Sequence, residues 1–263
     1  MRDTPVRPIR YWDVRRDTAQ EVAAYIVAEA GLCVHVNGQE WVRLMCSPHS
    51  VEDLVVGFLY LEGVIRTPED IAVLEVTGNR RCVDVWLRYS VPELPRRATI
   101  TSGCGGGVTF EREETTFSVG EDPFTLSPDT IAALMQELYQ AARAYQQARG
   151  IHAAGLSDGE RLLFVAEDVG RHNAVDRVCG QALCARALDQ CKVLLTTGRI
   201  SSEMARKAAR MQVPVLASRT SPTEFAVRLA ERWGMTVIGY VRRHHLRVYS
   251  HPRRVMGETD TTP

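Results

Sequence analysis

Apolar and polar positions in the first part of the chain follow the pattern of short paired strands. Residues 32–37 and 41–46 flank Asn37-Gly38, a dipeptide typical of hairpin turns. A second strand pair is predicted at residues 71–76 and 82–87, around another turn signal. The pattern therefore predicts two hairpins in this part of the chain.

One helix is predicted between these two hairpins. The sequence Ser50-Val51-Glu52-Asp53 resembles a capping box, and apolar residues then recur at helical spacing until Gly63. We therefore expect residues 1–125 to form a smaller, β-rich part of the molecule.

The remaining residues, 126–263, show strands alternating with helices. Ser127-Pro128 opens a long helix with an apolar face. Strands are predicted at residues 162–166, 193–197 and 213–217, each followed by a polar motif and a helix. This alternation predicts the α/β class, with a parallel or mixed sheet covered by helices.

The polar motifs after these three strands are candidate ligand-binding loops. They occupy residues 167–173, 198–203 and 218–224 and are rich in arginine and hydroxyl groups. Ligands of such sheets bind at the carboxyl ends of strands, so we expect an anionic-ligand site at one sheet edge. Capping of helices by Asn173, Ser202 and Ser221 is compatible with this interpretation.

The motif that contains His172 is open to two interpretations. Asp168, Arg171 and Asp176 accompany the imidazole, and a carboxylate beside a histidine can orient a proton carrier. A histidine between a strand and a helix is more often a structural hydrogen-bond donor, which is the interpretation we favour.

Charge and hydropathy restrict the class of protein. The 263 residues include 32 basic and 32 acidic side chains, so no general attraction to nucleic acid or to a membrane is implied. The chain has neither an apolar run long enough to span a bilayer nor a start that resembles a secretory signal. We expect a soluble cytoplasmic protein.

Basic residues are concentrated near the end of the chain. No Asp or Glu occurs from Arg232 to Gly257, whereas arginines and histidines are frequent there. Arginine offers a forked donor to phosphate, so this segment is a candidate polyanion site. The alternative is that arginine simply fills most basic positions, because the chain has only two lysines.

Cysteine usage indicates one candidate nucleophile. The seven cysteines are odd in number and scattered, which favours reduced thiols over a disulfide framework. Cys179, Cys184 and Cys191 are interpreted as small core residues rather than metal ligands, and no metal site is predicted. Cys104 stands in the glycine-rich sequence Thr101–Gly107, which either presents a reactive thiol or forms a tight turn.

Several motifs together resemble the formate dehydrogenase accessory sulfurtransferase family, often written FdhD. The resemblance extends from the first hairpin to Arg254 and rests on motifs at residues 53–65, 102–105, 150–154, 167–177, 198–203 and 249–254. The string from Glu167 to Asp176 is the most specific of these.

The resemblance implies a cytoplasmic, homodimeric sulfur carrier with a larger domain similar in fold to cytidine deaminases. Such a protein accepts sulfur from a cysteine desulfurase as a persulfide, here on Cys104. It then passes the sulfur to the molybdenum or tungsten bis-guanine-dinucleotide cofactor of formate dehydrogenase, for which a guanine nucleotide such as GDP is a surrogate. Cofactor binding is assigned by the resemblance to Tyr240, Val241, Arg242, Arg243, His244 and His245, with Gly198 and Arg199 as additional contacts.

This chain departs from the family in its cysteine loop. Members often carry a Cys-x-x-Cys pair, but Gly107 stands three positions after Cys104. Either Cys104 acts alone, which we favour, or a distant thiol such as Cys82 or Cys46 assists. The third possibility is that the protein is a non-catalytic chaperone that delivers the cofactor. A hydrolytic deaminase is disfavoured because the zinc-ligand pattern of that class is absent.

Overall fold

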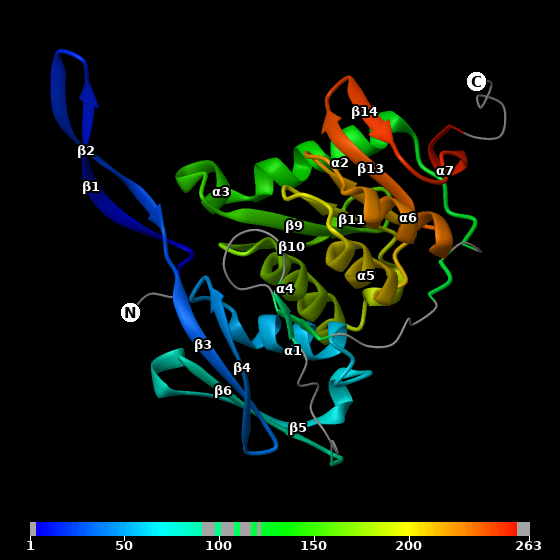
Figure 1. Ribbon diagram of the computed structural model, residues 1–263, viewed down its shortest axis with the longest axis horizontal. Helices are drawn as coiled ribbons and strands as arrows, with labels where there is room; N and C mark the ends of the chain where they lie inside the picture. Colours follow the sequence, from blue (N-terminus) through cyan, green and yellow to red (C-terminus); the bar gives the residue numbers. More distant parts are fainter. Residues whose placement is uncertain (1–3, 91–97, 101–107, 111–116, 120–121, 257–263) are drawn as a thin grey trace.

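The computed structural model describes residues 4–90, 98–100, 108–110, 117–119 and 122–256. Figure 1 shows a large sheet with helices on both faces, a smaller sheet beside it, and a long hairpin that projects away. The structure confirms the predicted α/β class. The division at residue 125 and the likeness to deaminases stay predictions.

The projecting hairpin consists of β1 (Val6–Arg15) and β2 (Thr18–Val27), which pair only with each other. Most of its side chains are exposed, including Trp12 and Tyr25. The pattern of the chain did not lead us to expect this element.

The smaller sheet has the strand order β4-β3-β6-β5. It contains β3 (Ala30–Val36), β4 (Gln39–Cys46), β5 (Ile71–Thr77) and β6 (Cys82–Leu87), which confirms both predicted hairpins. One-turn 3-10 helices precede β5 at Pro68–Asp70 and follow it at Gly78–Arg80. The two central strands, β3 and β6, run parallel to each other.

A disulfide between Cys33 and Cys82 joins these central strands, where the two residues are partners in register. The expectation that all thiols are reduced is therefore wrong for this pair. No local pattern indicates this bond, because the two cysteines have a sequence separation of 49 and only the parallel pairing of β3 with β6 brings them together.

Helix α1 (Val51–Leu61) covers one face of the smaller sheet and buries eight of its residues. The helix was predicted, but the capping box was not correct. Ser50 has a left-handed backbone with φ of 39°, and its side chain makes no capping hydrogen bond. Its carbonyl oxygen instead accepts a hydrogen bond from Arg177.

The larger sheet has the strand order β10-β9-β11-β12-β13-β14. Its strands are β9 (His152–Ser157), β10 (Leu162–Asp168), β11 (Val193–Thr196), β12 (Val215–Ser218), β13 (Thr236–Arg242) and β14 (His245–Val248). Strand β9 is antiparallel to both of its neighbours, so β10, β11, β12 and β13 all point the same way. Two short strands, β7 (Ala98–Ile100) and β8 (Val108–Phe110), pair separately.

Two hydrophobic cores form on the opposite faces of this sheet. Helix α2 (Pro128–Ala141) covers one face, with Ile131, Leu134 and Leu138 buried, and α3 (Arg143–Ala148) follows it. Helices α4 (Arg171–Cys184), α5 (Ser202–Arg210) and α6 (Glu224–Trp233) cover the other face. A 3-10 turn at Leu188–Gln190 and the short α7 (Arg253–Met256) complete the described helices.

The residues that begin the helices differ in part from those predicted. Ser127 caps α2 by accepting a hydrogen bond from the Thr130 N–H, as expected for a serine before proline. Asn173 and Ser202 lie inside α4 and α5, which begin after Gly170 and Ser201, and Thr223 rather than Ser221 caps α6. No described helix is both long enough and apolar enough to cross a membrane.

The two sheets are joined through α1 and α4, which approach each other closely at two glycines. A Cβ on Gly57 would lie 1.8 Å from the Asp176 carbonyl oxygen, and one on Gly180 would lie 1.9 Å from that of Asp53. Only glycine permits this backbone contact. The core beneath α4 consequently continues without a break into the smaller sheet.

Candidate functional site

The carboxyl ends of β10, β11, β12 and β13 lie along one edge of the larger sheet, because these strands share one direction. This confirms that the three polar motifs predicted after strands meet at a common edge. The turn from β13 to β14, which contains Arg243 and His244, lies at the same edge.

A pocket of about 540 Å³ opens between this turn and helix α2. A volume of this order suits a small-molecule ligand. Four of the predicted cofactor-binding residues line it, namely Val241, Arg242, Arg243 and His244. The other lining residues are Asp129, Ala132, Ala133, Met135, Gln136 and Arg219.

Arginine dominates the charge of this pocket. Arg219, Arg242 and Arg243 contribute three guanidinium groups, against the single carboxylate of Asp129. The pocket is therefore suited to an anionic ligand.

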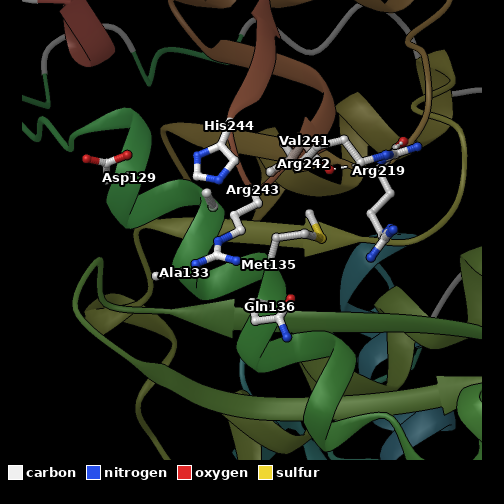
Figure 2. A pocket seen from close by; sticks show the side chains of 10 residues that line it. Asp129, Ala133, Met135, Gln136, Arg219, Val241, Arg242, Arg243 and His244 are labelled. Carbon is white, nitrogen blue, oxygen red and sulfur yellow. Dashed lines mark hydrogen bonds between the residues drawn. The ribbon is translucent and has the colours of Figure 1, made fainter.

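The two adjacent arginines of the turn have different roles. Arg242 donates a hydrogen bond of 2.7 Å from Nη1 to the Arg219 carbonyl oxygen, and so ties the turn to the loop after β12. Figure 2 shows this bond and shows Arg243 extending on the other side, beside Ala133 of α2. Arg243 is thus the better placed of the two to contact a ligand, and Arg242 positions the loop.

Sequence reasoning missed Arg219 and the α2 residues as parts of the pocket. Arg219 belongs to the polar motif at residues 218–224, after β12, and its guanidinium lies 5.5 Å from the centre of the Tyr139 ring. Its position at the carboxyl end of a strand could have indicated that it contributes to a ligand site. The contribution of Met135 and Gln136 depends on the packing of α2 across the sheet, which no local pattern reveals.

Four predicted binding residues lie outside the residues that line the pocket. Tyr240 has a left-handed backbone with φ of 54°, and its ring stacks 4.4 Å below the Arg247 guanidinium. His245 is exposed at the start of β14. Gly198 follows β11, where its carbonyl oxygen accepts a 2.6 Å hydrogen bond from Ser218, and Arg199 is exposed.

The motif at residues 167–177 forms a buried polar network centred on Asp168. Oδ1 of this carboxylate accepts hydrogen bonds from Gly170 N and from Nδ2 of Asn173, at 2.8 and 3.0 Å. Oδ2 accepts from Ser47 N at 3.1 Å and from Arg177 Nε at 2.8 Å. Asp168 is thus fully engaged without His172, and the arrangement does not support an Asp168–His172 proton relay.

Arg177 connects this network to the turn between β4 and α1. Its guanidinium donates to the carbonyl oxygens of Ser47, His49 and Ser50, and the side chain is fully buried.

A second buried ion pair lies beside this one: Asp176 pairs with Lys207, which also lies 3.9 Å from Glu62. Burial raises the pKa of Asp176 to about 6, although Lys207 opposes the shift.

Glu167, the first residue of this motif, supports helix α3. Its carboxylate accepts hydrogen bonds from Ala144 N and Tyr145 N at 3.1 and 2.6 Å. Most of the motif that carried the family resemblance thus holds secondary-structure elements together.

Cys104, the predicted nucleophile, lies outside the described residues. Among the other six cysteines, Cys33 and Cys82 form the disulfide, and Cys46, Cys179 and Cys191 are buried. Burial raises the pKa of Cys46 and Cys191 to about 12 and raises that of Cys179 as well. The two thiols that were considered as assisting Cys104 are not suited to nucleophilic attack. Cys82 is part of the disulfide, and Cys46 is buried in the core.

Cys184 is the one exposed cysteine among those described, contrary to its predicted core position. Partial burial still raises the pKa of its thiol. In the part of the chain that the structure describes, no three His, Cys, Asp or Glu side chains are grouped to hold a metal ion.

Comparison with known proteins identifies the class of this fold and site. Residues 27–256 match the model of the FdhD/NarQ family. The chain belongs to this family.

Individual relatives agree with this assignment over nearly their whole length. The chain is 36% identical over 259 residues to a sulfur carrier protein FdhD of Bacillus subtilis, covering 96% of this chain and 97% of that protein. It is 34% identical over 245 residues to the protein of the same name from Listeria monocytogenes, covering 90% and 94% of the two chains. A crystal structure of a formate dehydrogenase accessory protein from Desulfotalea psychrophila superimposes with a TM-score of 0.78 at 26% identity, covering 96% of this chain and all of that one.

Proposed function

We propose that this protein is a sulfurtransferase that carries sulfur as a persulfide on Cys104 and serves formate dehydrogenase. The family membership and the names of the relatives support the carrier role. The observation that supports Cys104 as the carrier is the state of the other cysteines, since five of the six described are either bonded or buried.

Sulfur enters by exchange with a persulfide on a cysteine desulfurase. The Cys104 thiolate attacks the outer, sulfane sulfur, a new S–S bond forms on Cys104, and the desulfurase cysteine leaves as a thiolate. No net oxidation occurs. A single carrier thiol suffices for this step, which fits the absence of a second cysteine within three positions of Cys104.

The acceptor in this proposal is the bis-guanine-dinucleotide cofactor of molybdenum or tungsten, held as a substrate. The pocket between α2 and the β13–β14 turn would hold one nucleotide portion, with Arg243 and Arg219 facing its phosphates. Arg242 would act indirectly, because its guanidinium is bonded to the Arg219 carbonyl oxygen.

Mass spectrometry after incubation with a cysteine desulfurase and cysteine tests the carrier role. Trypsin cleavage after Arg97 and Arg112 releases residues 98–112, whose only cysteine is Cys104. We expect this peptide to gain the mass of one sulfur atom, reversibly with a reductant. C184S is the matched control and should still be loaded. Sulfur appearing only on the Cys184 peptide, or on no peptide, contradicts the assignment.

Calorimetric titration with GDP tests the pocket separately. We expect Arg243→Ala to weaken binding about tenfold, the loss of one charge-assisted hydrogen bond, and C104A to leave it unchanged. C104A should also abolish maturation of formate dehydrogenase. Full maturation by this variant would instead support the chaperone alternative, in which the protein delivers the cofactor without sulfur chemistry.

A further inference from the structure

A second group of polar residues lies at the same sheet edge, around the ends of β10, β9 and β11, whereas the pocket lies beside the ends of β12 and β13. Helices α4 and α5 both begin there, directly after β10 and β11, and β9 begins between them at His152. His152 is the register partner of Asp168, the last residue of β10. The starts of two helices therefore flank one histidine, and each start favours a negative charge.

Two buried polar atoms at these helix starts have no hydrogen-bond partner among the described residues. They are Nε2 of His172, in the first turn of α4, and Oγ of Ser201, the residue before α5. The two residues are only 8% and 6% exposed. A buried polar atom without a partner is costly, and such atoms occur where a ligand completes the bonding.

Positive groups surround His172. Its pKa is lowered to about 3 mainly by burial, and then by the charges of Lys207, Arg171 and His152. The nearby carboxylates are already engaged, Asp168 by Arg177 and Asp176 by Lys207. The charges that act on the pKa of His172 are thus all positive, although Asp176 balances that of Lys207.

Gly198 brings the loop after β11 into contact with the same groups. A Cβ at this position would lie 3.0 Å from the Arg171 Cβ and 3.4 Å from the His152 Nδ1. Thr197, beside it, lies with Oγ1 3.5 Å from His152 Nδ1. Glycine thus allows the starts of α4 and α5 to approach each other around the two histidines.

We propose that His152, Arg171, His172, Gly198 and Ser201 form a binding site for a tetrahedral oxyanion, namely a phosphate group. We call it the strand-edge phosphate site. It goes beyond the proposed function, since it requires neither a persulfide nor Cys104. The phosphate is either free or part of a nucleotide whose base lies elsewhere.

Histidine side-chain NMR of the wild-type protein tests this site. Sodium phosphate is titrated against sodium chloride at equal ionic strength, while the ring nitrogen signals are followed. We expect saturable shifts of the His152 and His172 signals with phosphate and none with chloride. Shifts confined to His244, which lines the other pocket, would overturn the proposal, as would an absence of saturable shifts.

Variants provide the second measurement. His172→Phe keeps a ring but removes both ring nitrogens, and it should weaken phosphate binding about tenfold, with folding confirmed by circular dichroism. Arg243→Ala, in the other pocket, should leave phosphate binding at His172 intact. Equal affinities of H172F and wild type, or loss of phosphate binding in R243A alone, contradict the assignment.

GDP and guanosine distinguish the two sources of the phosphate. If the site takes the phosphate of a nucleotide, H172F weakens GDP binding but not guanosine binding. If it takes free phosphate, H172F leaves both nucleotide affinities unchanged while inorganic phosphate binding falls. Persulfide formation on Cys104 is measured independently, so failure of one proposal does not imply failure of the other.

Discussion

Arg177 and Asp168 form an ion pair of 2.8 Å in which both side chains are almost completely buried. The pair joins α4 to the end of β10, and the same guanidinium holds the turn before α1 through three carbonyl oxygens. A large part of the family motif at residues 167–177 therefore acts as a clamp between the two sheets.

Removing the Arg177 guanidinium should strongly destabilise the fold. R177M leaves the Asp168 carboxylate buried without its charge partner, and we expect the free energy of unfolding to fall by about 3–5 kcal/mol. Urea denaturation measures this. The control is R186M, which removes an exposed pair with Glu69 of 2.7 Å and should cost less than about 1 kcal/mol. Similar losses for the two variants would contradict the clamp.

The close approach of α1 and α4 leads to a second prediction, which concerns the loss of stability when a methyl group is added at the contact. Gly57→Ala and Gly180→Ala each place a methyl group within 2 Å of a backbone carbonyl oxygen, so the helices must separate. We expect a loss of about 3 kcal/mol or more in thermal or urea unfolding. Gly31→Ala is the matched control, because its new methyl would meet only Met45 Sδ at 3.7 Å. Unfolding midpoints of G57A and G180A equal to that of G31A would refute the predicted clash.

The Cys33–Cys82 disulfide should stabilise the smaller sheet. It closes a loop with a sequence separation of 49, for which loop entropy gives about 4 kcal/mol. We expect dithiothreitol to lower the unfolding free energy of the wild type by about this amount. It should change the unfolding free energy of C82S very little, because that variant lacks the disulfide. C184S should respond to the reductant as the wild type does. Non-reducing peptide mapping that shows free Cys33 and Cys82 in the purified protein would remove the basis of this prediction.

Acid should destabilise the protein through His172. The folded-state pKa is about 3 against an ordinary value of 6.5, so the unfolded chain takes up this proton first. The contribution of neutral His172 to the free energy of unfolding is fully present above pH 6.5. Below pH 6.5 it falls by about 1.4 kcal/mol per pH unit. Asp176 opposes this trend, because its raised pKa of about 6 favours the folded state as it becomes protonated.

Comparison of H172Q with the wild type isolates the histidine contribution, since Asp176 is present in both proteins. We expect the difference in unfolding free energy to shrink or reverse in favour of H172Q between pH 7 and pH 5. H245Q, which replaces an exposed histidine, should follow the wild-type curve. A difference between H172Q and wild type that is independent of pH would show that His172 is not buried in its neutral form.

Local patterns were sufficient for much of the fold. The turn at Asn37-Gly38 and the apolar face of α2 depend on neighbouring residues, and the structure places both elements where they were predicted. The predicted long helix is, however, interrupted at Ala142, which separates α2 from α3. The common sheet edge also followed from the alternation of strands and helices. At this edge, four of the eight predicted cofactor contacts line the pocket.

Features that depend on distant packing were not predictable in this way. Ser50 has the sequence of a helix cap, but its carbonyl oxygen bonds to Arg177, 127 positions away. The register of β3 with β6, which creates the disulfide, likewise depends on how two hairpins combine. The roles of Arg177 and Asp168 could be read from the sequence only as a motif, because their partners lie on another element.

The backbone contact between α1 and α4, together with the Arg177 clamp, has a consequence for how the protein can change shape. Swinging the smaller sheet as a hinged lobe would break the hydrogen bonds from the buried Arg177 guanidinium to the turn before α1 and open a seam lined by glycines. The two sheets should therefore tumble as one rigid body in solution. Any conformational change during sulfur transfer has to occur in segments other than the contact between α1 and α4.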